Sequence, residues 1–165
     1  MRIVVADTSP LIFLAKLALL EKVCKNFTLI TTSVVIDEAT WKKDLPDSKY
    51  ILRMVEKGFI DVHDINRRLI NNYQKNWGLG IGEASTFALF ESIGDILLID
   101  DYVAITVART QNINYITTPV LIYEITQRKI ISTSQSRHKL IALKEYSWIE
   151  DEIIDVVISW FEKGN

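Results

Sequence analysis

Short apolar runs alternate along the chain with longer segments in which apolar residues recur at helical spacing. We interpret the short runs as strands, at residues 2–6, 27–31, 59–62, 95–99 and 115–117. Strands separated by helices in this rhythm predict a parallel sheet with helices packed on both faces. We therefore expect an α/β fold of three layers, α/β/α, in which the central parallel sheet has about four to five strands.

Start and stop signals place several helices between these strands. Residues 10–20 are apolar on all sides and predict one buried helix. Ser33 is placed to cap a helix that runs as far as Trp41, and Asp47 to cap another that stops at Gly58. Further helices are expected at residues 65–77, 83–92 and 103–110, from Pro119 onward, and at 150–162.

No linker, repeat or change of composition divides the 165 residues, which predicts a single domain over residues 1–165. The C-terminal helices, at about residues 134–163, are expected to pack on the core or on a partner subunit. Lys16 interrupts the longest apolar stretch, so neither a membrane span nor a signal sequence is expected. These features favour a cytoplasmic protein that does not bind membranes.

The composition restricts the chemistry that the chain can perform. It contains one cysteine, Cys24, and two histidines, His63 and His138, which lie far apart in the sequence. The single cysteine excludes an internal disulfide and a cysteine-based zinc site. The two distant histidines strongly disfavour a histidine-rich metal site. The net charge of −2 also means that overall charge does not attract nucleic acid. Metal binding or acid–base chemistry must depend on carboxylates.

Several carboxylates follow the predicted strands. Asp7 comes directly after the first strand, and Asp100 and Asp101 follow the fourth. Glu38 and Glu83 lie in helices that begin at the same edge of the sheet. Clustered carboxylates repel one another and raise each other's pKa unless a cation neutralises them. Mg²⁺ or Mn²⁺ is the natural cation for oxygen ligands, and such ions can promote phosphodiester cleavage.

Each acid by itself also has a structural explanation. Asp7 is placed to cap the helix that opens at Pro10, and Glu38 is suited to an exposed helix position. Glu83 can stabilise the positive end of its helix, and one of Asp100 and Asp101 can cap the helix that follows. The joint placement of these acids at one edge of the sheet favours a functional site.

Four segments around these acids resemble, in order and spacing, the acidic motifs of the PIN domain family, the nuclease fold of VapC-type toxins. The segments are residues 4–12 around Asp7, 34–39 around Glu38, 79–84 around Glu83 and 97–108 around Asp100 and Asp101. The third resembles the Gly-x-Gly-Glu-Ala motif of one prokaryotic subfamily. The resemblance spans most of the chain.

The resemblance implies a divalent-metal-dependent endoribonuclease, with the toxins of toxin–antitoxin pairs among its relatives. It implies that Mg²⁺ or Mn²⁺ is bound by Asp7, Glu38, Glu83 and Asp101, with Asp100 either replacing Asp101 or sharing its role. Ser9 would support these ligands through hydrogen bonds. The implied partners are RNA, a second copy of the chain in a homodimer, and an antitoxin protein.

The sequence departs from the family pattern in two places. Ile105 and Thr106 stand where the subfamily often has an arginine, and residues 116–119 replace a glycine-rich turn. These departures leave open an alternative, a catalytically weak or inactive PIN-fold module that binds RNA or protein. The retained acids favour the nuclease.

Basic and aromatic residues near the acids are candidates for RNA contact. Lys42, Lys43 and Arg109 lie one or two turns beyond the acids, where they can either bind the RNA backbone or simply be solvated. Among the tryptophans, Trp77, just before the glycine-rich segment, is the one expected near the site.

Overall fold

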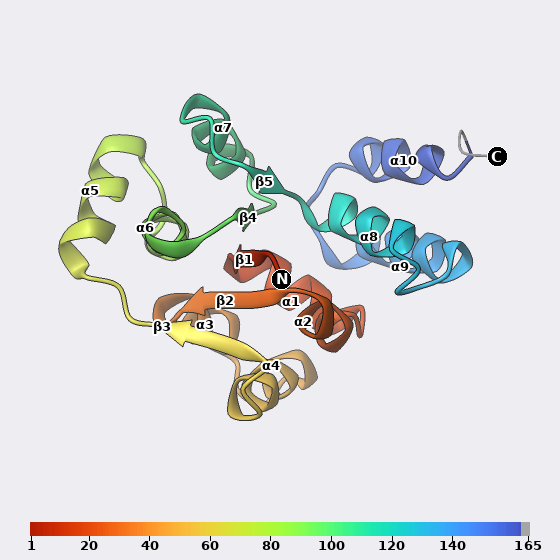
Figure 1. Cartoon of the computed structure of the whole chain (residues 1–165), viewed down its shortest axis with the longest axis horizontal. Helices are drawn as coiled ribbons and strands as arrows, with labels where there is room; N and C mark the ends of the chain where they lie inside the picture. Colours follow the sequence, from red (N-terminus) through yellow and green to blue (C-terminus); the bar gives the residue numbers. More distant parts are fainter. Residues whose placement is uncertain (163–165) are drawn as a thin grey trace.

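Residues 1–162, the part that the computed structural model describes, contain a five-stranded parallel sheet of order β3-β2-β1-β4-β5 (Figure 1). The strands are β1 (Ile3–Ala6), β2 (Thr28–Thr32), β3 (Ile60–His63), β4 (Ile96–Leu98) and β5 (Tyr115–Ile116). Each neighbouring pair is parallel. The predicted α/β/α fold with a central parallel sheet is confirmed.

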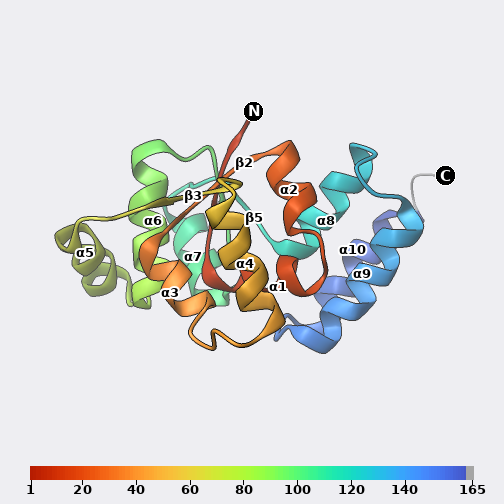
Figure 2. The same ribbon diagram turned by 90° about the horizontal axis from the view of Figure 1, so that it is seen from below.

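Helices cover both faces of this sheet (Figures 1 and 2). They are α1 (Thr8–Lys16), α2 (Leu20–Asn26), α3 (Ser33–Ala39), α4 (Pro46–Glu56), α5 (Arg67–Trp77), α6 (Ile81–Ile93), α7 (Tyr102–Thr110), α8 (Thr118–Gln127), α9 (Thr133–Tyr146) and α10 (Asp151–Trp160). Alternate strand residues face opposite layers. Val4 and Ala6 pack with α1, α2, α4 and α8, whereas Val5 packs with α5, α6 and α7.

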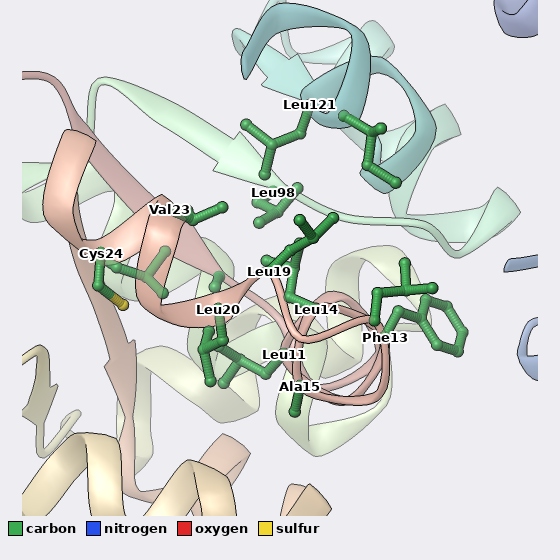
Figure 3. Packing of buried hydrophobic residues seen from close by; sticks show 14 of the residues in the cluster. Leu11, Phe13, Leu14, Ala15, Leu19, Leu20, Val23, Cys24, Leu98 and Leu121 are labelled. Carbon is green, nitrogen blue, oxygen red and sulfur yellow. The ribbon is translucent and has the colours of Figure 1, made fainter. Parts of the chain in front are cut away.

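The larger of the two cores lies under α1 and α2. Figure 3 shows side chains of these helices gathered against Leu98 of β4 and Leu121 of α8. Cys24 is buried here, and burial raises the pKa of its thiol to about 12. A thiol held in the neutral form is a poor nucleophile, so Cys24 belongs to the packing of the core.

The C-terminal helices pack onto the same core. Leu140 and Leu143 of α9 and Ile154 and Val157 of α10 are buried in the cluster that contains α1. No helix among residues 1–162 combines the length and the apolar character needed to cross a lipid bilayer.

The expected single helix over residues 10–20 is wrong. The structure has two helices, α1 and α2, and Ala18 between them adopts a left-handed conformation with φ of 53°. The N–H groups of Ala18 and Leu19 donate to the carbonyls of Ala15 and Leu14 and so close the end of α1. Because the segment is apolar except for Lys16 and lacks glycine, its pattern does not indicate the break.

Two expected helix caps are also wrong. Thr32, not Ser33, caps α3, because its side chain accepts a hydrogen bond from the Val35 N–H. Pro46 opens α4 one residue before Asp47, at a position where its missing N–H is not needed. Helix α3 ends at Ala39, so Trp41 lies beyond the helix that was expected to contain it.

Candidate functional site

Four carboxylates come together at the carboxyl edge of the sheet, each from a different element. Asp7 follows β1, Glu38 lies near the end of α3, Glu83 lies in the first turn of α6, and Asp101 immediately precedes α7. Burial raises the pKa of both Asp7 and Glu83, and neighbouring negative charges add to it: those of Glu83 and Glu38 at Asp7, and those of Asp101 and Glu38 at Glu83. We call these four residues the acidic cluster.

Asp7 is the most deeply buried member of the acidic cluster, with 4% of its surface exposed. Burial first, and then the charges of Glu83 and Glu38, raise its pKa to about 7. The Thr86 hydroxyl of α6 donates a hydrogen bond to Asp7 Oδ1 over 3.2 Å. The Asp7 side chain makes no capping hydrogen bond to α1, so helix capping does not explain the acid at this position.

Glu38 packs directly against Gly82 on α6. A Cβ atom at position 82 would lie 2.8 Å from Glu38 Cδ, closer than carbon atoms approach one another in folded proteins. The Thr8 hydroxyl of α1 holds the same carboxylate by donating to Glu38 Oε2 over 2.7 Å. A side chain at position 82 would therefore displace the Glu38 carboxylate, although the helical backbone there does not itself need glycine.

Helix termini orient the other two members of the acidic cluster. Glu83 Oε2 accepts a hydrogen bond from the Gly80 N–H over 2.9 Å. Asp101 Oδ1 accepts from the N–H groups of Val103 and Ala104 over 2.7 and 3.0 Å. The helix-capping interpretation is thus correct for both acids and is compatible with a further role, because these contacts use one carboxylate oxygen of each.

Asp100 faces a different environment from its neighbour. Its carboxylate accepts hydrogen bonds from the Thr118 N–H over 2.7 Å and from the Thr118 hydroxyl over 2.5 Å. Burial raises its pKa to about 6, and no member of the acidic cluster contributes to that shift. The structure brings Asp101 into the acidic cluster, whereas Asp100 anchors the start of α8.

Hydroxyl groups support the acidic cluster, but from positions other than the expected one. Among residues 1–162, the side-chain hydroxyls that donate to its acids belong to Thr8 and Thr86, and Ser9 makes no such contact. Thr86 is separated from Asp7 by 79 positions in the sequence. Only the packing of α6 beside β1 reveals this pair.

The candidate RNA-binding cations occupy two regions. Lys42 and Lys43 are exposed in the segment between α3 and α4, close in sequence to Glu38. Arg109 lies in the last turn of α7, about 10 Å along the helix axis from its start beside Asp101. Its Nε donates to the Tyr115 hydroxyl over 2.7 Å. The structure therefore does not bring Arg109 to the acidic cluster.

Trp41, rather than the expected Trp77, is joined to a member of the acidic cluster by a hydrogen bond. Trp77 lines a surface pocket with Tyr73, Glu91 and Gln111. Trp41, by contrast, donates its backbone N–H to the carbonyl of Glu38 over 3.3 Å, and its side chain is 84% exposed. Trp41 was expected inside the helix that begins near Ser33; because α3 ends at Ala39, its exposed position close to Glu38 was not predicted.

The donor chemistry of the acidic cluster fits a hard divalent cation. Among residues 1–162, no three His, Cys, Asp or Glu side chains are close enough together to form a ready-made metal site. Mg²⁺ does not require such a set, because it usually keeps several waters and binds through one or two carboxylates. Asp7 and Glu83, whose pKa values are raised by burial and then by neighbouring negative charge, are the groups that a cation would relieve.

Comparison with known proteins connects the chain to a family. A family model described as "PIN domain" matches residues 3–163. No curated protein and no solved structure matches the chain.

Proposed function

This chain belongs to the PIN domain family, whose fold is that of nucleases, and we propose that it is a divalent-metal-dependent endoribonuclease. The observation that carries the proposal is the acidic cluster. Burial, and then the charges of neighbouring members, raise the pKa of Asp7 and of Glu83, and none of the ion pairs between side chains of residues 1–162 includes a member of the cluster. Carboxylates perturbed in this way cluster at sites where a cation or a reaction uses them.

In the proposed site, the carboxylate oxygens not used in the hydrogen bonds above are the candidate ligands of Mg²⁺ or Mn²⁺. The bound ion would polarise the scissile phosphate and lower the pKa of the attacking water. Thr86 and Thr8 hold Asp7 and Glu38 in place, and the N-termini of α6 and α7 orient the other two acids. Asp100 is assigned to positioning α8 rather than to ligation.

The test is cleavage of a labelled single-stranded RNA with Mn²⁺, with Mg²⁺ or with chelator. Glu38→Gln should reduce cleavage by more than the roughly 10–100-fold typical of losing an outer contact to a metal site. Asp37→Asn is the matched control, because Asp37 is an exposed acid next to Glu38 on α3. Metal-independent cleavage, or equal loss in both variants, would contradict the proposal. No cleavage by the unmodified protein would favour the alternative, a PIN-fold module that only binds.

We further propose that the protein is the toxin of a toxin–antitoxin pair. The resemblance of its acidic motifs to those of VapC-type toxins supports this role. Induced expression in a bacterial host should arrest growth, and Glu38→Gln should abolish the arrest. Arrest that persists in this variant would separate toxicity from the proposed chemistry.

A homodimer is also proposed on the basis of the family resemblance. The C-terminal helices expose Ile141, Ile153 and Val156, each at 48–54% of its surface, and a second copy of the chain would cover such side chains. Light scattering should then give about twice the chain mass of 19.0 kDa. A mass of one chain at micromolar concentration would contradict the dimer.

A further inference from the structure

Two aromatic side chains next to the acidic cluster are almost fully exposed. Trp41 exposes 84% of its surface and Tyr102 exposes 80%, the largest fractions of any aromatic residue among residues 1–162. Folding gains little from an aromatic ring left in water, because the stabilisation comes from removing its surface from solvent. These two rings are therefore available to a ligand.

Their positions relate both rings to the acidic cluster. Tyr102 directly follows Asp101 and is the first residue of α7. Trp41 follows Glu38 by three positions and is tied to it by the backbone hydrogen bond from the Trp41 N–H to the Glu38 carbonyl. The α3–α4 connection, which carries Trp41, lies at the lower edge of Figure 2, the edge toward which β1 runs from the N-terminus.

The backbone beneath each ring is fixed by hydrogen bonds. The Tyr102 carbonyl accepts from the Thr106 hydroxyl over 2.9 Å, within α7. After Trp41, the Leu45 N–H donates to the Lys42 carbonyl over 3.0 Å and closes a turn. Rings on an ordered backbone lose less entropy when a planar ligand stacks on them.

Two cations accompany Trp41. Lys42 and Lys43 are both exposed, and neither takes part in the ion pairs found within residues 1–162. Exposed aromatic rings beside free cations form the usual surface for single-stranded nucleic acid, in which bases stack on the rings and phosphates contact the cations. The acidic cluster itself attracts no phosphate, so these lysines supply the local positive charge.

We propose that Trp41 and Tyr102 stack on unpaired bases of the RNA strand whose phosphate lies at the acidic cluster, with Lys42 and Lys43 contacting its backbone. The inference rests on the proposed function and adds a requirement for unpaired bases. In a duplex, the faces of the bases are already stacked on one another, so the rings gain a contact only by unstacking them. The surface therefore selects single-stranded over double-stranded RNA.

The test measures binding without cleavage, so that it does not depend on catalysis. A fluorescein-labelled single-stranded RNA of mixed sequence is titrated with protein in chelator and followed by anisotropy, for the unmodified protein, Trp41→Ala, Tyr102→Ala and Trp148→Ala. Trp148 is the matched control, because it is also a largely exposed tryptophan, at 65%, but lies between α9 and α10. Each of the first two variants should bind on the order of 10-fold more weakly, and the control should bind as the unmodified protein does.

A conservative variant and a duplex complete the test. Trp41→Phe should recover most of the affinity lost in Trp41→Ala, because a phenyl ring still stacks. The same sequence as duplex RNA should bind more weakly than the single strand and should respond little to either alanine substitution. Thermal melting should show that these variants are folded, since the replaced side chains are exposed.

Four outcomes overturn the inference. Three concern binding: unchanged affinity in Trp41→Ala and Tyr102→Ala, equal weakening in Trp148→Ala, and equal binding of duplex and single strand. The fourth is a change of oligomeric mass in the alanine variants, because it would assign the rings to a protein contact. If the binding pattern holds and the unmodified protein cleaves nothing with metal, the stacking surface stands and the proposed catalysis fails.

Discussion

Replacement of Asp7 by asparagine should stabilise the metal-free protein at neutral and alkaline pH. Asp7 is buried, its pKa is raised to about 7, and its charge is opposed by Glu83 and Glu38. Asparagine has nearly the same shape and no charge, and its amide oxygen can accept the hydrogen bond that Thr86 donates to Asp7 Oδ1. The substitution thus removes a buried charge, together with its repulsion by neighbouring carboxylates, and keeps the packing.

The pKa shift sets the size and the sign of the effect. The carboxyl ionises near pH 3.8 in the unfolded chain and near pH 7 in the folded protein, so between these values the folded state holds the extra proton. Stability therefore falls as pH rises through this window, and above about pH 7 the whole penalty is present. At 1.36 kcal/mol for each pKa unit, the ionised carboxylate lowers the free energy of unfolding by about 4 kcal/mol at most.

Thermal melting in chelator at pH 4, 6 and 8 measures the effect. For a chain of this length, about 4 kcal/mol corresponds to a rise in Tm of roughly 8–16 °C for Asp7→Asn at pH 8, and the rise should shrink toward zero at pH 4. Mn²⁺ or Mg²⁺ should raise the Tm of the unmodified protein and leave that of the variant nearly unchanged. Asp37→Asn, which replaces an exposed acid, should change neither the Tm in chelator nor the rise in Tm caused by the metal ion.

The refuting result is an Asp7→Asn variant that melts at or below the temperature of the unmodified protein at pH 8 in chelator. It would mean that the Asp7 carboxylate is stabilised by partners within the folded chain. The acidic cluster would then be a satisfied structural network that needs no cation.

Two further substitutions test the packing around the acids. Gly82→Ala places a methyl group 2.8 Å from Glu38 Cδ and should reduce RNA cleavage as strongly as Glu38→Gln. Gly80→Ala is the control and should retain activity, because its methyl group makes ordinary contacts of 3.5 Å or more. Equal activity in the two alanine variants would count against the assigned role of Glu38. Thr118→Val removes the hydroxyl that donates to Asp100 and should lower the free energy of unfolding in urea by roughly 1–3 kcal/mol. The loss should be larger above about pH 6, where Asp100 is ionised. Unchanged stability at pH 8 would contradict the anchoring role of Asp100.

The sequence predicted the architecture because its signals are local. Strands separated by helices determine a parallel sheet, and the carboxyl-edge rule places acids that follow strands on one side of it. The break at Ala18 was not predictable, because an alanine with positive φ leaves no trace in the hydrophobic pattern. Its neighbours Leu17 and Leu19 are both buried in the core under α1 and α2.

Contacts between distant elements could not be predicted from local signals. Thr86 reaches Asp7 and Gly82 admits Glu38 only because α6 packs at one rotation and one distance beside β1 and α3. The exposure of Trp41 depends likewise on α3 ending at Ala39. A sequence pattern defines the end of a helix less sharply than its presence, so this position could not be predicted. The acids at the site were predictable from the sequence, whereas the residues that hold them in position were not.

The choice between Asp100 and Asp101, which the sequence left open, follows from the alternation of side chains along β4. Leu97 faces the core under α6 and α7, and Leu98 faces the core under α1 and α8. The extended chain continues past β4, since the Ile99 N–H donates to the Ile116 carbonyl, and Ile99 again faces α6 and α7. By the same period of two, Asp100 points to the layer of α8, where Thr118 binds it, and Asp101 points to the layer of α6.

Strand β1 obeys the same rule. Val5 faces the layer of α6, so Asp7, two positions later, points to that layer as well and meets Thr86. Glu83 belongs to α6 itself, and Glu38 lies against Gly82 of α6. Four of the five candidate acids therefore meet because Asp7 and Asp101 point to the layer of α6 and the other two lie on α6 or against it. Insertion of one residue in β1 or β4 would turn Asp7 or Asp101 to the opposite layer and so separate the acids.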